Sequence, residues 1–396
     1  MIYCRSVSSL LLLSGLAISL FESPEAFAQS SITPDDTLGA QSAQVQSVDA
    51  TTERIDGGVL RNTNLFHSFL DFNVGANQQV YFSNPAAVEN IFSRVTGGSV
   101  SNILGTLGVD GPANLFFLNP KCIVFGEDAS LDIAGSFLAT TAGAIAFQDG
   151  TQFSAIAPNN SSPLTVSVPL GLQPAPTEGS IENSGVLSTA QDLTLAADSL
   201  NLNGQLSAGE DLTLRSDNPI NGDSQYQSGG IFRVETAAGT VGDLNSPGGT
   251  VIRAGGNVAI NDYAGASLHI LAGGSVDVNS ATVTIAAHNT ALGENTLQET
   301  IALSDGTTVE VAGAVQPTID IRAGMPGTTS SGNPSGNSSG NGSNADINAT
   351  KLLIDAPNGV IILNNQFELG PTTGDINITG TAIGDGVLIG NVAGRG

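Results

Sequence analysis

The chain has 396 residues, with 36 acidic against 11 basic side chains and a formal net charge of −25. A charge of this sign opposes binding to nucleic acid and to anionic membrane surfaces. Charged residues make up only 12% of the chain, and Gly and Pro number 49 and 17, so the composition is neither that of an acidic disordered tail nor that of a low-complexity chain.

Residues 1–28 have the pattern of a signal peptide. Arg5 supplies a positive charge, and the apolar run from Leu10 to Phe21 is shorter than the ~20 residues that span a bilayer. Ala26-Phe27-Ala28 matches a cleavage site, so we expect the Sec machinery to export the chain and the mature protein to begin at Gln29.

The cysteine count follows from this leader. Cys4 would be removed with it, so Cys122 would be the single cysteine of the mature chain, and we expect no internal disulfide framework. We interpret Cys122 as a small apolar residue in a strand.

Two apolar runs, Leu115–Leu118 and Cys122–Phe125, are separated by Asn119-Pro120-Lys121. Asn-Pro predicts a turn, and tight turns favour Asn or Gly at the next positions because these residues tolerate positive φ. If such a turn is kept, Cys122 has positive φ at a cost on the order of 1 kcal/mol. We favour the alternative, in which Cys122 is an ordinary inward strand residue.

Helix signals are nearly missing, and alternating strings such as Asp192-Leu-Thr-Leu195 predict short strands with one buried face. SGVLSTAQDLTL from Ser184 and NGQLSAGEDLTL from Asn203 share seven of twelve positions at an offset of 19, and IRAGGNVAI from Ile252 returns as ILAGGSVDV at an offset of 18. Repeats of this length built from strands indicate a β-helix, whose coils stack ~4.8 Å apart.

The segment from 325 to 344 is rich in Gly, Ser and Asn and is expected to be a loop outside the solenoid. Further coils are expected over 345–396. No polar capping element is evident before Gly396, which favours a fragment or a truncated product, since solenoids normally end in a cap.

The chain between Ile32 and Ala142 resembles a known family. The matching strings are SITPDDTL from Ser31, IDGGVLRNTNLFHSFLDFNV from Ile55, VYFSNP from Val80, IFSRVTGGSVSNILGTLGV from Ile91, and ANLFFLNPKCIVFGEDASLDIAGSFLATTA from Ala113. Together they are similar to the haemagglutination-activity, or two-partner secretion (TPS), domain at the N-terminus of filamentous-haemagglutinin-type exoproteins.

This resemblance implies an all-β fold: a single-stranded, right-handed parallel β-helix of the pectin-lyase-like type with an N-terminal cap. The domains expected are the signal peptide (1–28), the TPS domain (29–165), β-helix repeats (166–324), the Gly/Ser/Asn-rich loop (325–344) and further coils (345–396).

The family carries an Asn-Pro-Asn-Gly-Ile motif in a turn between two strands, which falls here on Asn119, Pro120, Lys121, Cys122 and Ile123. Lys121 and Cys122 depart from it, and this departure bears on transporter recognition at the turn rather than on the fold. The family string Asn64-Leu65-Phe66-His67-Ser68-Phe69 is the second candidate set.

The resemblance also implies a route and partners. An outer-membrane β-barrel transporter with periplasmic domains would recognise the N-terminal domain in a Gram-negative cell and export the chain to the medium or the cell surface. The solenoid would then act as an adhesin or stalk toward a host or cell-surface ligand that the residues do not identify. No nucleic acid partner is expected.

We expect no enzyme, catalytic residue, cofactor or metal. The histidines do not have zinc-ligand spacing; they are His67, His269 and His288. The G-x-S-x-G match from Gly336 to Gly340 lies in the Gly/Ser loop, whereas a catalytic serine of this motif needs a strand before it and a helix after it.

Two alternatives stay open. A β-helical polysaccharide lyase or hydrolase would need convergent carboxylates or a carboxylate with a base, but Asp192, Asp211 and Asp277 recur at outward positions and are expected to form a solvated face. A contact-dependent toxin would require a C-terminal effector domain, so this chain would be a truncated one.

Overall fold

The computed structural model describes residues 30–158, 169–175, 179–290, 298–302, 308–325, 345–365 and 374–390. The predicted signal peptide lies outside these residues, as does the predicted loop after Met325. Within the described part of the chain, no helix is long and apolar enough to cross a membrane.

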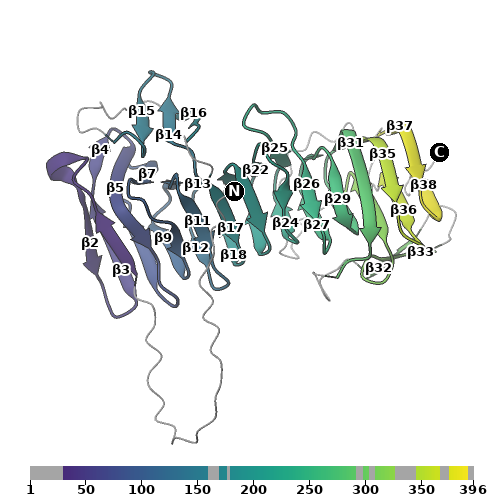
Figure 1. Ribbon diagram of the computed structural model, residues 1–396, viewed down its shortest axis with the longest axis horizontal. Coiled ribbons are helices and arrows are strands. Elements are labelled where there is room, and N and C mark those ends of the chain that lie inside the picture. Colours follow the sequence, from purple (N-terminus) through teal and green to yellow (C-terminus); the bar gives the residue numbers. More distant parts are fainter. Residues whose placement is uncertain are drawn as a thin grey trace, which may run out of the picture.

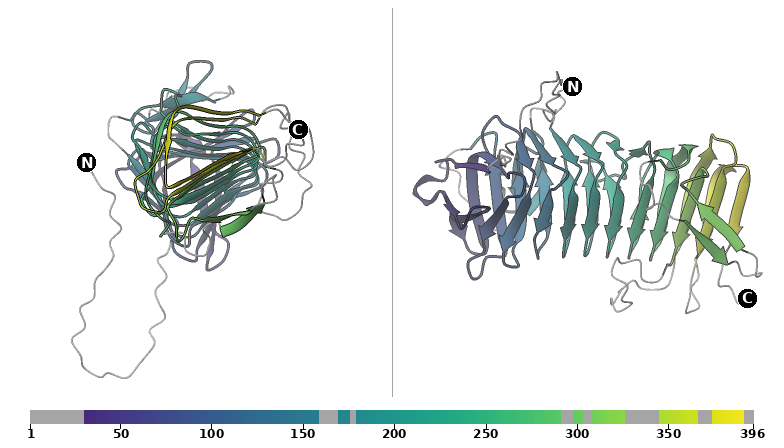
Figure 2. Two further views of the ribbon diagram at one scale, coloured as in Figure 1. Left: turned by 90° about the vertical axis from the view of Figure 1, so that its right-hand side faces the viewer. Right: turned by 90° about the horizontal axis from the view of Figure 1, so that it is seen from below.

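The chain winds into stacked coils of parallel strands (Figures 1 and 2). Leu195 pairs with Leu214 and Ile252 pairs with Ile270 in parallel registers, so the sequence offsets of 19 and 18 residues each correspond to one coil. The predicted parallel β-helix is therefore confirmed.

A typical coil has three strands, and equivalent strands of successive coils form three ladders, which we call I, II and III in the order in which the chain visits them. Ladders I and II belong to one sheet because three long strands near the C-terminal end run through both. Ladder I contains β5 (Asn64–Asn73), β7 (Asn90–Val95), β10 (Asn114–Leu118), β13 (Phe137–Thr140), β19 (Leu193–Ala196), β22 (Leu212–Arg215), β25 (Phe232–Glu235), β28 (Val258–Ala259), and the first parts of β31 (Val276–Ala287), β35 (Ile347–Ile354) and β37 (Ile376–Ile383). Ladder II contains β8 (Ser101–Ile103), β11 (Cys122–Phe125), β17 (Ser180–Asn183), β20 (Ser199–Leu202), β23 (Ile220–Asn221), β26 (Leu244–Ser246), β29 (Tyr263–Ala266), and the later parts of β31, β35 and β37. Ladder III contains β3 (Thr52–Gly57), β6 (Gln79–Ser83), β9 (Thr106–Asp110), β12 (Ser130–Asp132), β18 (Val186–Thr189), β21 (Gln205–Ala208), β24 (Gln225–Ser228), β27 (Thr250–Ala254), β30 (Leu268–Ala272), β34 (Thr318–Ala323), β36 (Val360–Asn365) and β38 (Gly386–Gly390).

The core follows from the period-2 pattern. In the strand Leu193-Thr-Leu-Ala196 both leucines are fully buried and the threonine between them is half-buried. Because the same alternation recurs in successive coils, inward Leu, Ile, Val and Phe side chains form one continuous column along the solenoid.

The N-terminal end carries the expected cap. Strands β1 (Ser31–Pro34) and β4 (Val59–Arg61) pair antiparallel with β5, and β2 (Ala43–Ser47) pairs antiparallel with β3. A short 3₁₀ turn, η1 (Gly39–Gln41), lies between β1 and β2. Antiparallel pairing of this kind covers hydrogen-bonding groups that the first coil would otherwise leave open.

Two antiparallel insertions were not foreseen from the sequence. Strands β14 (Ala144–Phe147), β15 (Gln152–Ser154) and β16 (Pro169–Gln173) form a small sheet outside ladder I, which we call the extra-helical sheet (Figure 1). Strands β32 (Gln298–Ala302) and β33 (Thr308–Ala312) form a hairpin that reaches the outer face of ladder III, where Gly313 lies against the ring of His269.

One corner of the coils is built from glycine. An added Cβ at Gly229 would lie 2.0 Å from the carbonyl oxygen of Gly209, and one at Gly255 would lie 2.0 Å from that of Gly229. Backbones of successive coils therefore touch at the corner between ladders III and I, and any side chain there would force them apart.

Candidate functional site

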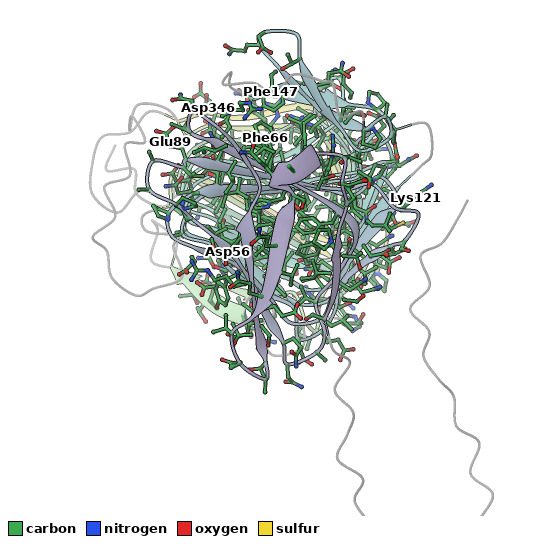
Figure 3. All side chains as sticks on the ribbon, turned by 90° about the vertical axis from the view of Figure 1, so that its left-hand side faces the viewer. Asp56, Phe66, Glu89, Lys121, Phe147 and Asp346 are labelled. Atoms are coloured by element: carbon green, nitrogen blue, oxygen red, sulfur yellow. The ribbon has the colours of Figure 1, made fainter. Side chains whose placement is uncertain are left out.

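The turn from Asn119 to Ile123 joins β10 to β11 and is packed into the coil. The Asn119 side chain is fully buried; its Nδ2 donates to the carbonyl oxygen of Ser99 at 3.1 Å and to Ser101 Oγ at 2.9 Å. Its Oδ1 accepts the Lys121 backbone N–H at 2.9 Å, which makes an Asx turn. Pro120 and Ile123 are buried, and only Lys121 is exposed, projecting from the rim of the coil in Figure 3.

Cys122 is the first residue of β11 and is 5% exposed. The described non-glycine residues with positive φ are Asn62, Asn77, Ala87 and Asn358, so Cys122 is in ordinary extended backbone. Its Sγ lies 3.5 Å from Ser180 Oγ on the next coil. The turn with positive φ at Cys122 is therefore absent, and Cys122 is a buried strand residue as predicted. Its expected inward orientation is not borne out: Ile123 and Phe125 belong to the main core, so Cys122 lies with Val124 on the opposite face of β11.

The second candidate set, Asn64 to Phe69, forms the first half of β5, and all six side chains are buried. Leu65 and Phe69 pack in the main core, whereas Phe66 points outward and packs beneath the extra-helical sheet. This half of β5 is buried on both faces because the solenoid interior and the inserted sheet cover it from opposite sides.

His67 lies inside the solenoid, with ring centroids 5.4 Å from Phe82 and 6.2 Å from Phe69. Neither ring nitrogen has a hydrogen-bond partner among the described residues. Burial lowers the pKa of His67 to about 4, against a small opposing effect of the Asp56 charge. The side chain is a neutral packing residue at physiological pH.

The structure does not bring the two candidate sets into contact. Strand β5 pairs with β7 and β7 pairs with β10, so the string and the turn lie two coils apart along ladder I. They are connected by a stack of three rings: Phe66 and Phe92 have centroids 5.0 Å apart, and Phe92 and Phe116 have centroids 4.6 Å apart.

The extra-helical sheet covers this stack. The Phe153 ring lies 5.1 Å from Phe66 and the Phe147 ring lies 5.3 Å from Phe92, and Figure 3 shows Phe66 and Phe147 in the same region. Sequence reasoning missed this aromatic cluster. The available signal was Ala144-Ile-Ala-Phe147, an apolar string that interrupts the repeat spacing.

An asparagine ladder runs beside the aromatic stack. Asn90 Nδ2 donates to Asn64 Oδ1 at 3.1 Å, and Asn114 Nδ2 donates to Asn90 Oδ1 at 3.0 Å. Asn114 Oδ1 then accepts the Ser136 backbone N–H at 2.8 Å. Asn64 of the family string is therefore the first member of a chain of amides that fixes the register of four successive coils.

The prediction of a simply solvated aspartate face is wrong. Asp192 Oδ1 accepts the Asp211 backbone N–H at 3.0 Å, and Asp211 Oδ1 accepts that of Ile231 at 2.7 Å. Asp277 Oδ1 accepts the side-chain amide of Asn348 at 2.7 Å. All three half-buried carboxylates bond one coil to the next. Asp192 and Asp211 stand at a corner, where the next coil's N–H groups lack strand partners, whereas Asp277 lies within β31 and bonds to a side chain.

The remaining histidines do not form a site together. His288 is exposed, and His269 is buried with its Nδ1 3.3 Å from Asp320 Oδ2. Arg322 donates to both carboxylate oxygens of Asp320, and the cluster is buried where the residues after β33 cover ladder III. Among the described residues, no group of three or more His, Cys, Asp and Glu could hold a metal ion. The G-x-S-x-G match lies outside the described residues.

Comparisons with known proteins agree with the resemblance. The family model described as "TPS secretion domain" matches residues 30–269, more than half of the chain. A heme/hemopexin-binding protein of Haemophilus influenzae is 35% identical over 69 residues, which is 17% of this chain and 7% of that protein. The chain thus spans a small part of that relative's length.

A solved structure, the secretion domain of HMW1 from Haemophilus influenzae, is 14% identical, with 92% of this chain and 100% of that chain covered at a TM-score of 0.40. The family match over residues 30–269 includes the cap, the Asn119–Ile123 turn, the extra-helical sheet and the first regular coils. The chain belongs to the TPS secretion domain family of exoproteins, which are secreted or displayed at the cell surface.

Proposed function

We propose that residues 29–165 are the part of the chain that an outer-membrane transporter of the two-partner secretion type recognises. The Sec machinery would first deliver the chain to the periplasm through its leader. The transporter, a β-barrel with periplasmic domains, would then export it through the outer membrane. The coils after residue 165 would be displayed outside the cell as an adhesin or stalk.

The observation that carries this proposal is the burial of the Asn119–Ile123 turn. Asn119 and Ile123 are fully buried and Cys122 is 5% exposed, so the folded domain offers only Lys121 of this motif to a partner. A transporter that reads these side chains must therefore do so before β11 joins the solenoid. This matches an export route in which the chain passes through the pore unfolded.

The regular coils support the second half of the proposal. Each coil bonds to the coil before it, through strand pairing and through carboxylates such as Asp192 and Asp211. A newly exported coil therefore needs only its predecessor to fold. Its burial and hydrogen bonding would oppose backward movement of the chain without any nucleotide.

The test is a deletion. Removing Ser31 to Ala142 in a Gram-negative host that carries the cognate transporter should abolish the extracellular protein, while cleavage of the leader continues in the periplasm. Normal extracellular levels of the deleted chain would contradict the proposal.

The matched control removes residues 193–211, which is one complete coil because Leu193 pairs with Leu212. That deletion lets β22 take the place of β19 on β13 and should leave export intact. Loss of export in both deletions would show that any large change in the solenoid blocks secretion, and the recognition proposal would fail.

A further inference from the structure

A buried arginine joins three segments that are far apart in sequence. Arg94 on β7 is 3% exposed and donates to Thr37 Oγ1 at 2.8 Å, to Ser68 Oγ at 2.9 Å and to the carbonyl oxygen of Ser154 at 2.7 Å. Its guanidinium carbon also lies 4.5 Å from the centroid of the Phe153 ring. These partners belong to the segment after β1, to β5 and to β15.

The two hydroxyl groups that accept hydrogen bonds from Arg94 also donate hydrogen bonds to the carboxylate of Asp35. Thr37 Oγ1 donates to Asp35 Oδ1 at 2.6 Å, and Ser68 Oγ donates to Asp35 Oδ2 at 2.8 Å. Thr96 Oγ1 adds a third bond to Asp35 Oδ2, at 2.6 Å. Burial tends to raise the pKa of Asp35, but the hydrogen bonds from Thr37, Thr96 and Ser68 outweigh it and hold this pKa below its usual value.

The cluster is unlike the contacts in the regular coils. Arg215 bonds to Glu235, 20 residues later, which is its neighbour on the next coil. Arg94 instead bonds across 57 residues to Thr37 and across 60 residues to Ser154. A buried guanidinium that lacks any of these acceptors leaves charged donors unsatisfied, which destabilises the folded state.

We propose that Arg94 couples the N-terminal cap to the extra-helical sheet, so that the cap, β5, β7 and this sheet become stable together and only once residue 154 is available. The regular coils can fold one at a time, whereas this region cannot complete its first coils until the chain has supplied β15. The timing that this gives to export rests on the proposed function, but the coupling itself does not.

Amide hydrogen exchange of the purified mature chain tests the coupling at named groups. The Asp35 N–H bonds to the Ser68 carbonyl oxygen at 3.2 Å and reports on the cap; the Ala155 N–H bonds to the Gly143 carbonyl oxygen at 3.0 Å and reports on the inserted sheet. The Leu212 N–H, bonded to the Ile231 carbonyl oxygen at 2.9 Å, reports on the regular coils.

The decisive variant is Asp35→Asn. The hydrogen bonds of Asp35 go to Thr37, Ser68 and Thr96, and none goes to β15 among the described residues. Coupling predicts that Asp35→Asn accelerates exchange at Ala155 about tenfold, the equivalent of roughly 1.4 kcal/mol, with no change at Leu212. Thr96→Val, which removes one bond to Asp35, should do the same to a smaller extent and serves if Asp35→Asn does not fold.

Asp49→Asn is the matched control. Asp49 accepts from the backbone and hydroxyl of Thr51 and from the Thr52 N–H in an exposed loop, so the same chemical change should leave Ala155 unaffected. Arg94→Lys should accelerate exchange at Asp35 and Ala155 together, whereas Arg61→Lys, at an exposed position, should accelerate neither. Faster exchange at Asp35 alone, or at neither amide, would overturn the proposal. If a variant loses the coupling in amide exchange but is exported normally, the claim that the coupling sets the timing of export is wrong, and the proposed function still stands.

Discussion

The N-terminal coils and the regular coils share one winding but use their outward faces differently. In β5 the residues from Asn64 to Phe69 are all buried, because the extra-helical sheet covers the side away from the solenoid interior. In β22 buried and half-buried residues alternate, since the outward face of Thr213 and Arg215 meets water. The first region is stabilised by contacts between distant segments, and the second is stabilised by contacts between neighbours.

Because of this difference, the two regions should respond differently to mutation. A change in a regular coil alters the contacts of that coil with the coils on either side, as expected for a nearly one-dimensional repeat. A change beneath the extra-helical sheet alters contacts among the cap, three coils and an insertion at once. The following predictions test that contrast, from the largest expected effect to the smallest.

Phe92→Ala should have the largest effect. Phe92 is fully buried and stacks against both Phe66 and Phe116 beneath Phe147, so its removal should cost about 3–5 kcal/mol of local stability. Urea titration with amide exchange should show lost protection in β5, β10 and β14 together. Thr213→Ala, on the outward face of β22, should change the stability by less than about 0.5 kcal/mol. Comparable losses in the two variants would remove the contrast.

Acidification should destabilise the N-terminal region through His67. Its pKa falls from 6.5 to about 4 on folding, so protons bind the unfolded state more strongly, and stability is lost as the pH falls from 6.5 toward 4. The full loss is about 3 kcal/mol, from about 1.4 kcal/mol per pKa unit.

The variant His67→Phe should remove this part of the pH dependence in amide exchange of β5. His288→Phe, at an exposed histidine, should leave the pH profile of β5 as it is in the natural sequence. An unchanged profile in His67→Phe would mean that other groups cause the acid sensitivity.

Cys122→Gly should destabilise by about 1–2 kcal/mol, because it deletes a buried side chain and adds freedom to the unfolded chain. Cys122→Ala keeps the β-carbon and should cost less. Thermal melts of the two variants, both made in the leaderless mature chain, give the comparison. A glycine variant more stable than the alanine variant would mean that the turn prefers a left-handed residue after all.

Asp211→Ala should have the smallest effect. It removes the acceptor of the Ile231 N–H and should cost about 1 kcal/mol, while Asp211→Asn keeps an acceptor and should cost less. Exchange of the Ile231 amide measures the loss. Glu127→Ala, at an exposed acidic residue, should leave this amide unchanged. Equal effects of the alanine and asparagine variants at Asp211 would show that charge rather than hydrogen bonding matters there.

The fold was predictable wherever the sequence repeats. The offset between Leu195 and Leu214 predicts their pairing, because stacked coils place equivalent residues on top of one another. Cys122-Ile-Val-Phe125 likewise predicts a strand with Cys122 buried. In both places the local pattern and the tertiary contacts specify the same structure.

The candidate site was less predictable, because its contacts do not follow the repeat. Nothing local to Arg94 indicates that its guanidinium bonds to Thr37 and Ser154, since both partners arrive from insertions and cap segments of irregular spacing. The role of Asp211 was missed for a different reason. Period-2 patterning distinguishes inward from outward residues, but it does not reveal which outward carboxylates meet the backbone of the next coil.

The glycine corner gives the solenoid a property of a crystal lattice. Because Gly209, Gly229 and Gly255 let successive backbones touch, the rise per coil at this corner is fixed by contact between main chains rather than by side-chain size. A substitution such as Gly229→Val would act like a dislocation in a crystal. The coils on either side could each remain ordered, but their strands would no longer align across the substituted corner. The solenoid would bend or shear at that coil, and the change would be visible as a difference in its length and straightness.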